Sequence, residues 1–233
     1  EAGCERHLMR EKEISTLLDH PNIVRLEAYF QDSKNCYFLF ELCQVGDLNT
    51  FLKDYKKLNV KLTRQWIMEI INGLEHLRSH NIVNRDLKPK NILLDDTFHV
   101  KIADMGAAKE IDPIEVQREI DFINFESDDE DDDWNESSDE DSVSEGSESV
   151  GSDGSSSDSD DNDKDKRLKS YGLSNKRTQI GTAFYISPEM IKYQLACFGS
   201  DLWALGCIIY ECLTGKSPFI GRNTFEVQDK ILN

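Results

Sequence analysis

The stretch Asn84–Leu94, "NRDLKPKNILL", places four polar side chains of different chemistry close together. Arg85 and Asp86 are adjacent, Lys88 follows two positions after the acid, and Asn91 stands three positions further on. A carboxylate can accept a proton, a lysine can offset phosphate charge, and an amide oxygen can bind a hard cation. The apolar run that ends the stretch predicts a strand that anchors the loop. We therefore expect a base, a phosphate-directed cation and a metal ligand on one short loop.

Length and composition indicate an intracellular protein. The 233 residues suffice for one large domain or two small ones, and they contain no apolar run of 18 residues. The first residue is Glu1 and no signal peptide follows it, so the chain is predicted to be an internal piece of a soluble protein. Six cysteines without CxxC spacing favour reduced thiols. We expect a cytoplasmic location, with the nucleus as the alternative.

The histidines do not indicate a metal site. His76 and His80 lie one helical turn apart, but no acidic or thiol ligand is positioned with them. A solvated helix face is the expectation for this pair.

The negative charge is concentrated in one segment. Between Asp121 and Asp163, 19 acidic residues occur without a Lys or Arg, which leaves 26 acidic residues against 27 basic ones elsewhere. Residues 114–176 are mostly Ser, Asp, Glu and Gly, and such a composition buries too little apolar surface to offset ordering entropy. We predict a disordered acidic insertion that repels nucleic acid and anionic membranes. It is either a spacer or a tether for basic proteins.

Outside this segment, hydrophobic periodicity predicts a mixed helix and strand protein. Helical patterns cover three stretches: Glu5–Leu18, Thr63–His80 and Ser200–Leu213. Strand-like patterns cover five: Asn22–Phe30, Cys36–Leu42, Ile82–Val83, Ile92–Leu94 and Val100–Ile102. The last helix is apolar nearly all round and starts with capping residues, so we expect it at a domain centre.

Three further motifs follow the opening stretch in order. They are "DMG" at Asp104–Gly106, "GTAFYISPE" at Gly181–Glu189 and "SDLWALGC" at Ser200–Cys207. With N-R-D-L-K-P-K-N for H-R-D-L-x-x-x-N, D-M-G for D-F-G and S-P-E for A-P-E, the set resembles the eukaryotic protein kinase catalytic domain. Lys88 together with "GT" before the tyrosine is typical of the Ser/Thr type. "LDHPNIVRL" and "YFQDSKNCYF" are most similar to the 3-phosphoinositide-dependent branch of the AGC group.

The resemblance implies an α+β, bilobal, protein-kinase-like fold. Residues 1–42 would form a partial, truncated N-lobe beginning at helix C, and residues 43–233 a mostly helical C-lobe that lacks its C-terminal helices. The acidic insertion, residues 114–176, would lie in the activation segment. The implied cofactors are ATP and Mg²⁺, and the implied partners are protein substrates with Ser or Thr acceptors. Neither nucleic acid nor direct membrane insertion is expected.

The same resemblance assigns catalytic and regulatory roles. Asp86 would orient or accept the substrate hydroxyl proton, Lys88 would offset charge on the transferring phosphoryl group, and Thr182 would hydrogen-bond near Asp86. Asn91 and Asp104 would be the Mg²⁺ ligands. Two regulatory residues and one structural residue complete the assignment, namely Arg85 as a phosphate ligand, Thr178 as a phosphorylation site and Asp201 as the anchor of the catalytic-loop backbone.

For the nucleotide, the resemblance implies a pocket between the lobes. Leu93 would form its floor, Glu41 and Cys43 would offer backbone contacts from the hinge, Phe40 would be the gatekeeper and Asp47 would lie near the ribose. Glu11 matches the helix glutamate that pairs with a strand lysine in the family. That lysine and the glycine-rich loop have no counterpart here, so we expect an incomplete domain with little activity of its own.

Departures from the family pattern leave other functions open. Four positions of the stack that aligns the two lobes are Ser15, Leu26, Asn84 and Met105, where the family places apolar or aromatic residues. Buried Ser and Asn need hydrogen bonds, so a weakened stack is expected. The alternatives to an active serine/threonine kinase are therefore a pseudokinase scaffold and an acidic-tract binding module.

Overall fold

Helix α3, Val60–Ser79, is the central element of the structure. The computed structural model describes residues 2–114, 116, 117, 121 and 183–233. Trp66, Ile70 and Leu77 lie at helical spacing, and each is 1% exposed. The predicted helix is confirmed and begins three residues early, because the Oδ1 atom of Asn59 accepts the Leu62 N–H at 2.9 Å.

The other elements follow in chain order. They are α1 (Ala2–Leu17), β1 (Leu26–Gln31), β2 (Cys36–Phe40), β3 (Gly46–Asp47), α2 (Leu48–Tyr55), β4 (Ile82–Val83), η1 (Pro89–Asn91), β5 (Ile92–Leu94), β6 (Val100–Ile102), η2 (Met105–Ala107), β7 (Lys109–Glu110), α7 (Pro188–Lys192), α8 (Phe198–Thr214) and α9 (Thr224–Leu232). The predicted α+β class is confirmed.

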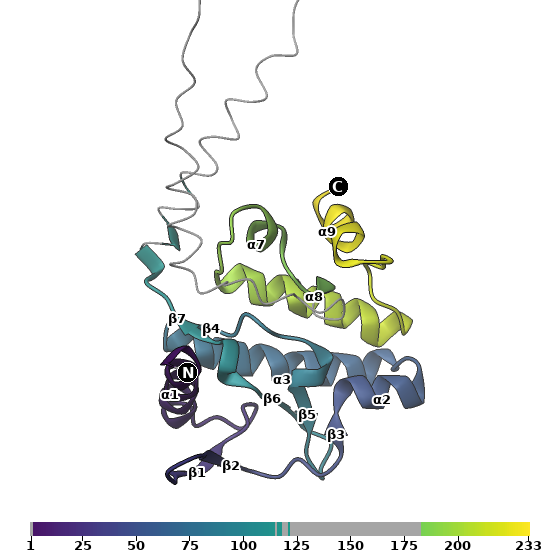
Figure 1. Ribbon diagram of the computed structural model, residues 1–233. Helices are drawn as coiled ribbons and strands as arrows, with labels where there is room; N and C mark the ends of the chain where they lie inside the picture. The colour runs from purple at the N-terminus through teal and green to yellow at the C-terminus, as the bar shows by residue number, and fades with distance from the viewer. Residues whose placement is uncertain (1, 115, 118–120, 122–182) are drawn as a thin grey trace, which may run out of the picture. The chain divides into compact units, whose positions relative to one another are not determined.

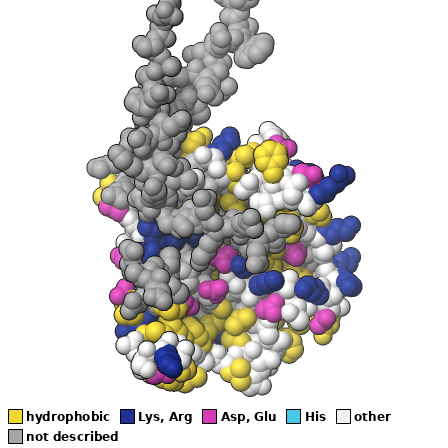
Figure 2. All heavy atoms as spheres, in the orientation of Figure 1, with side chains coloured by type: hydrophobic (Ala, Val, Ile, Leu, Met, Phe, Trp, Pro, Cys, Tyr) yellow, Lys and Arg dark blue, Asp and Glu magenta, His cyan; other side chains and the backbone are white. Residues whose placement is uncertain are grey.

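The strands form three small antiparallel sheets. β1 pairs with β2, the order of the second sheet is β3-β5-β6, and β4 pairs with β7. The described residues of Glu1–Pro113 and Lys176–Asn233 pack as one unit. Within it, α1 and the β1–β2 hairpin lie at one end of α3, while α8 runs along α3 (Figure 1). Hydrophobic side chains are exposed at the end of the surface that holds the hairpin (Figure 2), among them Phe30, which is 55% exposed.

The turn after α1 joins this end of the protein to α3 and β6. Ile23 forms a parallel bridge with Ile102, and the amide of Asn22 donates to the Val100 carbonyl at 3.0 Å. The rings of His20 and His76 stack with centroids 4.9 Å apart, and the Nε2 atom of His76 is buried. The predicted solvated face is confirmed for His80, which is exposed, but His76 is half-buried because it packs against His20 of this turn.

Helix α8 differs from the prediction at its start. It begins at Phe198 rather than Ser200, and the Ser200 hydroxyl instead accepts the Cys197 N–H at 3.2 Å from within the first turn. Leu202 is 56% exposed, so the helix is buried on one side and not all round. Among the helices of the described residues, none has both the length and the apolarity needed to cross a membrane.

The C-terminal end of α8 is closed by Gly215, which has φ +75°. A Cβ atom there would overlap the backbone carbonyl of Lys56. Gly206 lies inside the same helix, and a Cβ there would meet nothing within 4 Å. The two glycines therefore make a matched pair for substitution.

We predict that Gly215→Ala lowers the free energy of unfolding by about 1–3 kcal/mol, since it combines backbone strain with a clash. Gly206→Ala should raise that free energy by about 0.5–1 kcal/mol, because alanine favours helix interiors. Urea denaturation of the two variants measures both. Equal effects of the two substitutions would contradict the close contact at Gly215.

Candidate active site

The loop after β4 is held by a buried carboxylate from α8. Asp201, which is 5% exposed, accepts the Asn84 N–H at 2.8 Å through Oδ2 and the Arg85 N–H at 2.9 Å through Oδ1. These partners lie more than 100 residues apart in sequence. The expected role of Asp201 as the anchor of the loop backbone is confirmed.

Arg85 connects the loop to the segment after β6. Its φ of 66° is unusual for a residue with a side chain, and the Asp201 contact helps to hold it there. Its Nε atom donates to the Ala107 carbonyl at 2.7 Å. Burial lowers the pKa of Arg85, repulsion from Arg10 lowers it further, and Asp201 opposes both effects. The charges of Arg10 and Asp201 thus act on Arg85 in opposite directions.

Three of the predicted catalytic side chains contact one another. The Nζ atom of Lys88 lies 2.6 Å from Oδ2 of Asp86, and the amide nitrogen of Asn91 donates to the same oxygen at 3.1 Å. That nitrogen also donates to the Asp86 carbonyl at 3.0 Å. The contacts leave Oδ1 of Asp86 able to accept a proton and Oδ1 of Asn91 able to coordinate a cation.

Asp104 is connected to this group through the backbone. The residue before it, Ala103, donates its N–H to the Asn91 carbonyl at 2.8 Å. Asp104 has φ 62° and accepts the Gly106 N–H through Oδ1 at 3.1 Å. The Glu11 carboxylate approaches the same glycine, and both burial and the charge of Asp104 raise the pKa of Glu11. Two acidic groups therefore lie side by side next to the loop.

The residues predicted to form the nucleotide pocket include Phe40 at the end of β2, Glu41 and Cys43 after it, Asp47 on β3 and Leu93 on β5. Asp47 pairs with Leu93 in the sheet register. The carboxylate of Asp47 caps α2, accepting the N–H and the hydroxyl of Thr50 at 2.9 Å each. Phe40 ends β2 and is 36% exposed, and the half-buried Cys43 follows it closely in the chain.

Glu41, between them, makes both backbone and side-chain contacts. Its N–H donates to the Arg25 carbonyl at 3.0 Å, and its carboxylate accepts the Arg25 N–H at 2.7 Å. The Nζ atom of Lys101 lies 3.0 Å from Oε2 of Glu41. This side chain therefore contacts both β6 and the residue before β1.

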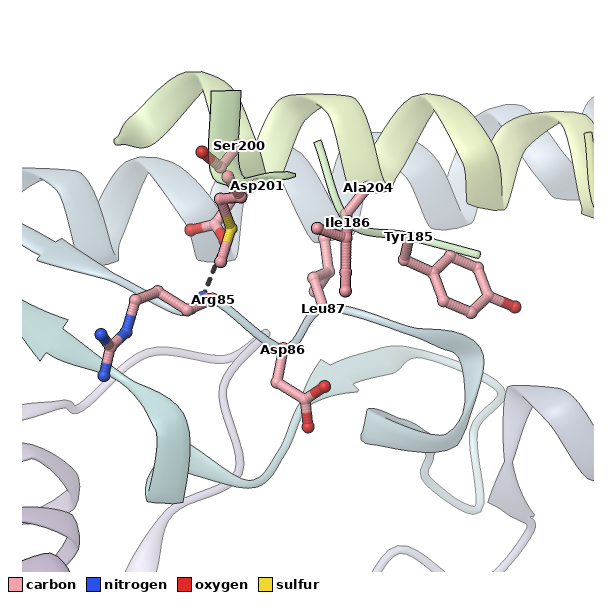
Figure 3. A pocket seen from close by; sticks show the side chains of 9 residues that line it. Arg85, Asp86, Leu87, Tyr185, Ile186, Ser200, Asp201 and Ala204 are labelled. Carbon is pink, nitrogen blue, oxygen red and sulfur yellow. Dashed lines mark hydrogen bonds between the residues drawn. The ribbon is translucent and has the colours of Figure 1, made fainter. Parts of the chain in front are cut away.

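A pocket lies between the loop and α8 (Figure 3). Tyr185 and Ile186 line it from the segment before α7, and the Tyr185 hydroxyl donates to Oε2 of Glu211 at 2.6 Å. Burial raises the pKa of Tyr185, and the neighbouring Glu211 raises it further, so this hydroxyl keeps its proton. In Figure 3 the carboxylate of Asp86 points away from α8, while Asp201 lies beside the backbone of Arg85. The loop is therefore anchored to α8 through its backbone, while the Asp86 side chain points to the opposite side.

Two of the four stack positions, Ser15 and Asn84, are polar and buried. Asn84 is 0% exposed, and its amide donates weakly to the sulfur of Met105 at 3.7 Å. Ser15 is 5% exposed, and its hydroxyl has no hydrogen-bond partner among the described residues. Leu26 is half-buried at the start of β1. A buried hydroxyl without a partner costs free energy, in agreement with a weakened stack.

Two predicted site residues cannot be placed. Thr178 and Thr182 lie outside the described residues, as does nearly all of the predicted acidic insertion.

Comparison with known proteins decides the family. A model of the family described as "Protein kinase domain" matches residues 1–121 and 162–233, which is most of the chain. The chain belongs to the protein kinase domain family. Members of this family in general transfer phosphate from ATP with the help of divalent metal ions.

Several curated kinases are similar over almost the whole chain. Human 3-phosphoinositide-dependent protein kinase 1 is 30% identical over 226 residues, which is 97% of this chain and 31% of that protein. Serine/threonine-protein kinase PKH3 of Saccharomyces cerevisiae is 32% identical over 230 residues, covering 97% of this chain and 21% of that kinase. Serine/threonine-protein kinase ksg1 of Schizosaccharomyces pombe is 28% identical over 98% of the chain and 31% of its own length. The chain thus spans less than a third of each of these relatives.

Sequence reasoning missed two contacts of this kinase domain and one neighbouring charge. Arg10 lies near Arg85, Lys101 binds Glu41, and Glu211 accepts the Tyr185 hydroxyl. A signal was present only for Arg10, which precedes the recognised Glu11 on the same helix. The other pairs join elements that are distant in sequence, so no local pattern marks them.

We predict that Asp201→Asn lowers the free energy of unfolding at pH 7 by about 1–3 kcal/mol, the cost of a buried donor without an acceptor. An amide presents one oxygen, so it cannot accept both the Asn84 and Arg85 N–H groups. Urea denaturation measures the loss, with the exposed Asp96→Asn as the matched control. Equal stability of the two variants would contradict the anchoring role.

The titration of Asp201 provides a second test. Burial raises the pKa of Asp201 to about 6, although the two backbone N–H groups and Arg85 oppose the rise. The folded state therefore retains a proton that the unfolded chain releases near pH 4, so the contribution of Asp201 to stability decreases as pH rises from about 4 to about 6. The difference in unfolding free energy between the unaltered protein and Asp201→Asn should change in this interval and be constant above it. A pH-independent difference would contradict the raised pKa.

Proposed function

We propose that the protein containing this chain is a serine/threonine protein kinase, which transfers the γ-phosphate of ATP to Ser or Thr hydroxyls of proteins in intracellular signalling. The observation that carries the proposal is the contact of Lys88 and Asn91 with one carboxylate oxygen of Asp86. This arrangement gathers a proton acceptor, a cation and a metal ligand at one point of a loop whose backbone is fixed. The similarity to serine/threonine kinases supports the choice of acceptor.

The fit of ATP and Mg²⁺ rests on the donor set. Among the described residues, no group of three or more His, Cys, Asp and Glu could hold a metal ion alone. Mg²⁺ is commonly bound by one or two protein oxygens together with substrate phosphates, so Asn91 Oδ1 and the Asp104 carboxylate suit it. Bound Mg·ATP would supply the transferable phosphoryl group and part of the charge that neutralises it. Leu93, Asp47 and the backbone at Glu41 and Cys43 would hold the nucleoside.

Different residues of the protein would accept the proton, offset the phosphoryl charge and bind the regulatory phosphate. Asp86 orients the acceptor hydroxyl and accepts its proton at Oδ1, while Oδ2 is held by Lys88 and Asn91. The ammonium group of Lys88, whose side chain is only 18% exposed, offsets negative charge beside the reacting group. Thr182 would hydrogen-bond near Asp86, and Arg85 with Arg10 would bind a phosphate on Thr178. Glu11 would accept a cationic partner, since its carboxylate lies beside Asp104.

A pseudokinase scaffold is the second candidate, and the buried polar groups of the stack favour it. Ser15 lacks a hydrogen-bond partner among the described residues, and Asn84 reaches only a sulfur through its amide nitrogen. However, Oδ1 of Asn84 also accepts the Asp86 N–H at 3.2 Å, so Asn84 helps to hold the loop that carries the proposed proton acceptor. Transfer of labelled phosphate to a Ser/Thr peptide by the full-length protein separates the two candidates, because a scaffold would transfer none.

Basic proteins are a further proposed class of partner. The support comes from composition, because the sequence between Asp121 and Asp163 contains 19 acidic residues and no Lys or Arg. Steering by such a segment weakens beyond about 8 Å at physiological salt. Deleting the segment should lower the rate on basic substrates more at low salt than at physiological salt, and unchanged kinetics at both would indicate a spacer.

We also propose a cytoplasmic location. Free thiols are found at Cys36, Cys43, Cys197, Cys207 and Cys212, as expected in a reducing compartment. Fluorescent tagging of the full-length protein would test it.

Asp86→Asn in the full-length protein should lower kcat by about 10²–10⁴, the usual effect of losing a proton acceptor. Transfer of labelled phosphate to a Ser/Thr peptide measures it, with Asp96→Asn as the control for a surface charge. Nucleotide affinity should be unchanged, since the substitution leaves the metal ligands intact. An unaffected kcat would remove Asp86 from the mechanism.

Asp104→Ala should abolish the dependence of nucleotide affinity on Mg²⁺, because a metal ligand is lost. Calorimetric titration with ADP, with and without Mg²⁺, gives the two dissociation constants. The unaltered protein and Asp96→Ala should bind more tightly with the metal. A variant that retains the full Mg²⁺ effect would show that Asp104 is not a ligand.

A further inference from the structure

Lys101 extends a row of residues already proposed to hold the nucleotide. In the β3-β5-β6 sheet, Asp47 is opposite Leu93 and Leu93 is opposite Lys101. Directly opposed residues project from the same face of an antiparallel sheet. The neighbours Val100 and Ile102 are 0% exposed and occupy the other face, in the core. Lys101 is therefore next to the proposed floor of the adenine pocket.

The ammonium group of Lys101 is committed to one partner. Its Nζ atom lies 3.0 Å from Oε2 and 3.1 Å from Oε1 of Glu41, so the carboxylate is bound through both oxygens. The exposed fractions of the two side chains are 13% for Lys101 and 22% for Glu41. Solvent and salt screen an ion pair with this little exposure less than they screen a surface pair. Removal of Lys101 would therefore leave the Glu41 carboxylate charged and without its partner in a site with little water.

Glu41 also forms hydrogen bonds with the backbone of Arg25. Its carboxylate also accepts the Arg25 N–H, while its own N–H donates to the Arg25 carbonyl at 3.0 Å. The charges of Glu41 and Lys101 both act on the Cys43 thiol, whose pKa is raised first by burial, further by Glu41, and lowered in part by Lys101. The ammonium group of Lys101 thus lies near residues 41–43.

We propose that Lys101 is a positioning residue that fixes the hinge segment 41–43 for nucleotide binding by clamping the Glu41 side chain to β6. The inference rests on the proposed kinase function. Lys101 would not touch the nucleotide, because its ammonium group is occupied by Glu41. Its effect should therefore appear in nucleotide affinity and not in the transfer step.

The test compares Lys101→Met, Lys101→Arg and the exposed control Lys53→Met in the full-length protein. Calorimetric titration with Mg·ADP should show about threefold to tenfold weaker binding for Lys101→Met, the scale of one lost charge-assisted hydrogen bond. Lys101→Arg should restore most of the affinity, since a guanidinium group can bind both carboxylate oxygens. Lys53→Met should bind as the unaltered protein does.

A second measurement does not depend on the nucleotide. Amide hydrogen exchange at Glu41, whose N–H bonds to the Arg25 carbonyl, should be faster in Lys101→Met than in Lys53→Met. In kinetic assays KM for ATP should rise about threefold to tenfold with the affinity loss, and kcat should stay within about twofold.

The outcomes separate the two proposals. If the unaltered protein binds Mg·ADP and Lys101→Met binds it equally well or more tightly, the positioning role is overturned and the kinase function stands. A loss of stability with unchanged affinity and unchanged Glu41 exchange would overturn it as well. Failure of the unaltered protein to bind Mg·ADP would overturn the proposed function, and this inference with it.

Discussion

Two hydrogen bonds from backbone N–H groups to the buried carboxylate of Asp201 determine the geometry of the site. They join α8 to the loop that follows β4, at Asn84 and Arg85. Burial of a charge is costly, and these donors repay only part of that cost, which is why the pKa of Asp201 remains raised. The contact fixes a loop whose next residues carry the polar groups, and it does so from helix α8, which is largely apolar.

This anchor explains how a short irregular segment can present its side chains precisely. With Asn84 and Arg85 fixed, the following turn directs Asp86 away from α8 (Figure 3). There its carboxylate contacts Lys88 and Asn91. Strand β5 begins immediately after Asn91, and its pairing with β6 brings Asp104 to the same end of the sheet. The proposed chemistry therefore depends on two rigid supports, one helix and one small sheet, on either side of the loop.

The sequence was informative where a local pattern carries the structure. Strands β4, β5 and β6 have the predicted bounds, and the periodicity of α3 identified its buried face. Linked motifs identified the loop and its anchor, because their order and spacing are specific even when each alone is weak. The predicted start of α8 was two residues late. Ser200 was expected to precede the helix, but it lies in the first turn, where its hydroxyl accepts the Cys197 N–H.

Contacts between distant segments could not be predicted in this way. The Lys101–Glu41 pair spans 60 positions, and the stacking of His20 on His76 spans a turn and a helix. Each depends on how the turn after α1 docks on α3 and β6, which is decided by packing and not by residue periodicity. The buried hydroxyl of Ser15 was foreseen as a cost, but its lack of a partner among the described residues became evident only from the structure.

Amide hydrogen exchange of Asn84 and Arg85, measured by NMR in the unaltered protein, tests the central claim most directly. If Asp201 holds the loop, both amides should exchange only through large-scale unfolding, at rates comparable to those of the buried turns of α8. Exchange at the rate of an exposed loop would show that the carboxylate does not anchor the loop, and the convergence of Asp86, Lys88 and Asn91 would lose its physical basis.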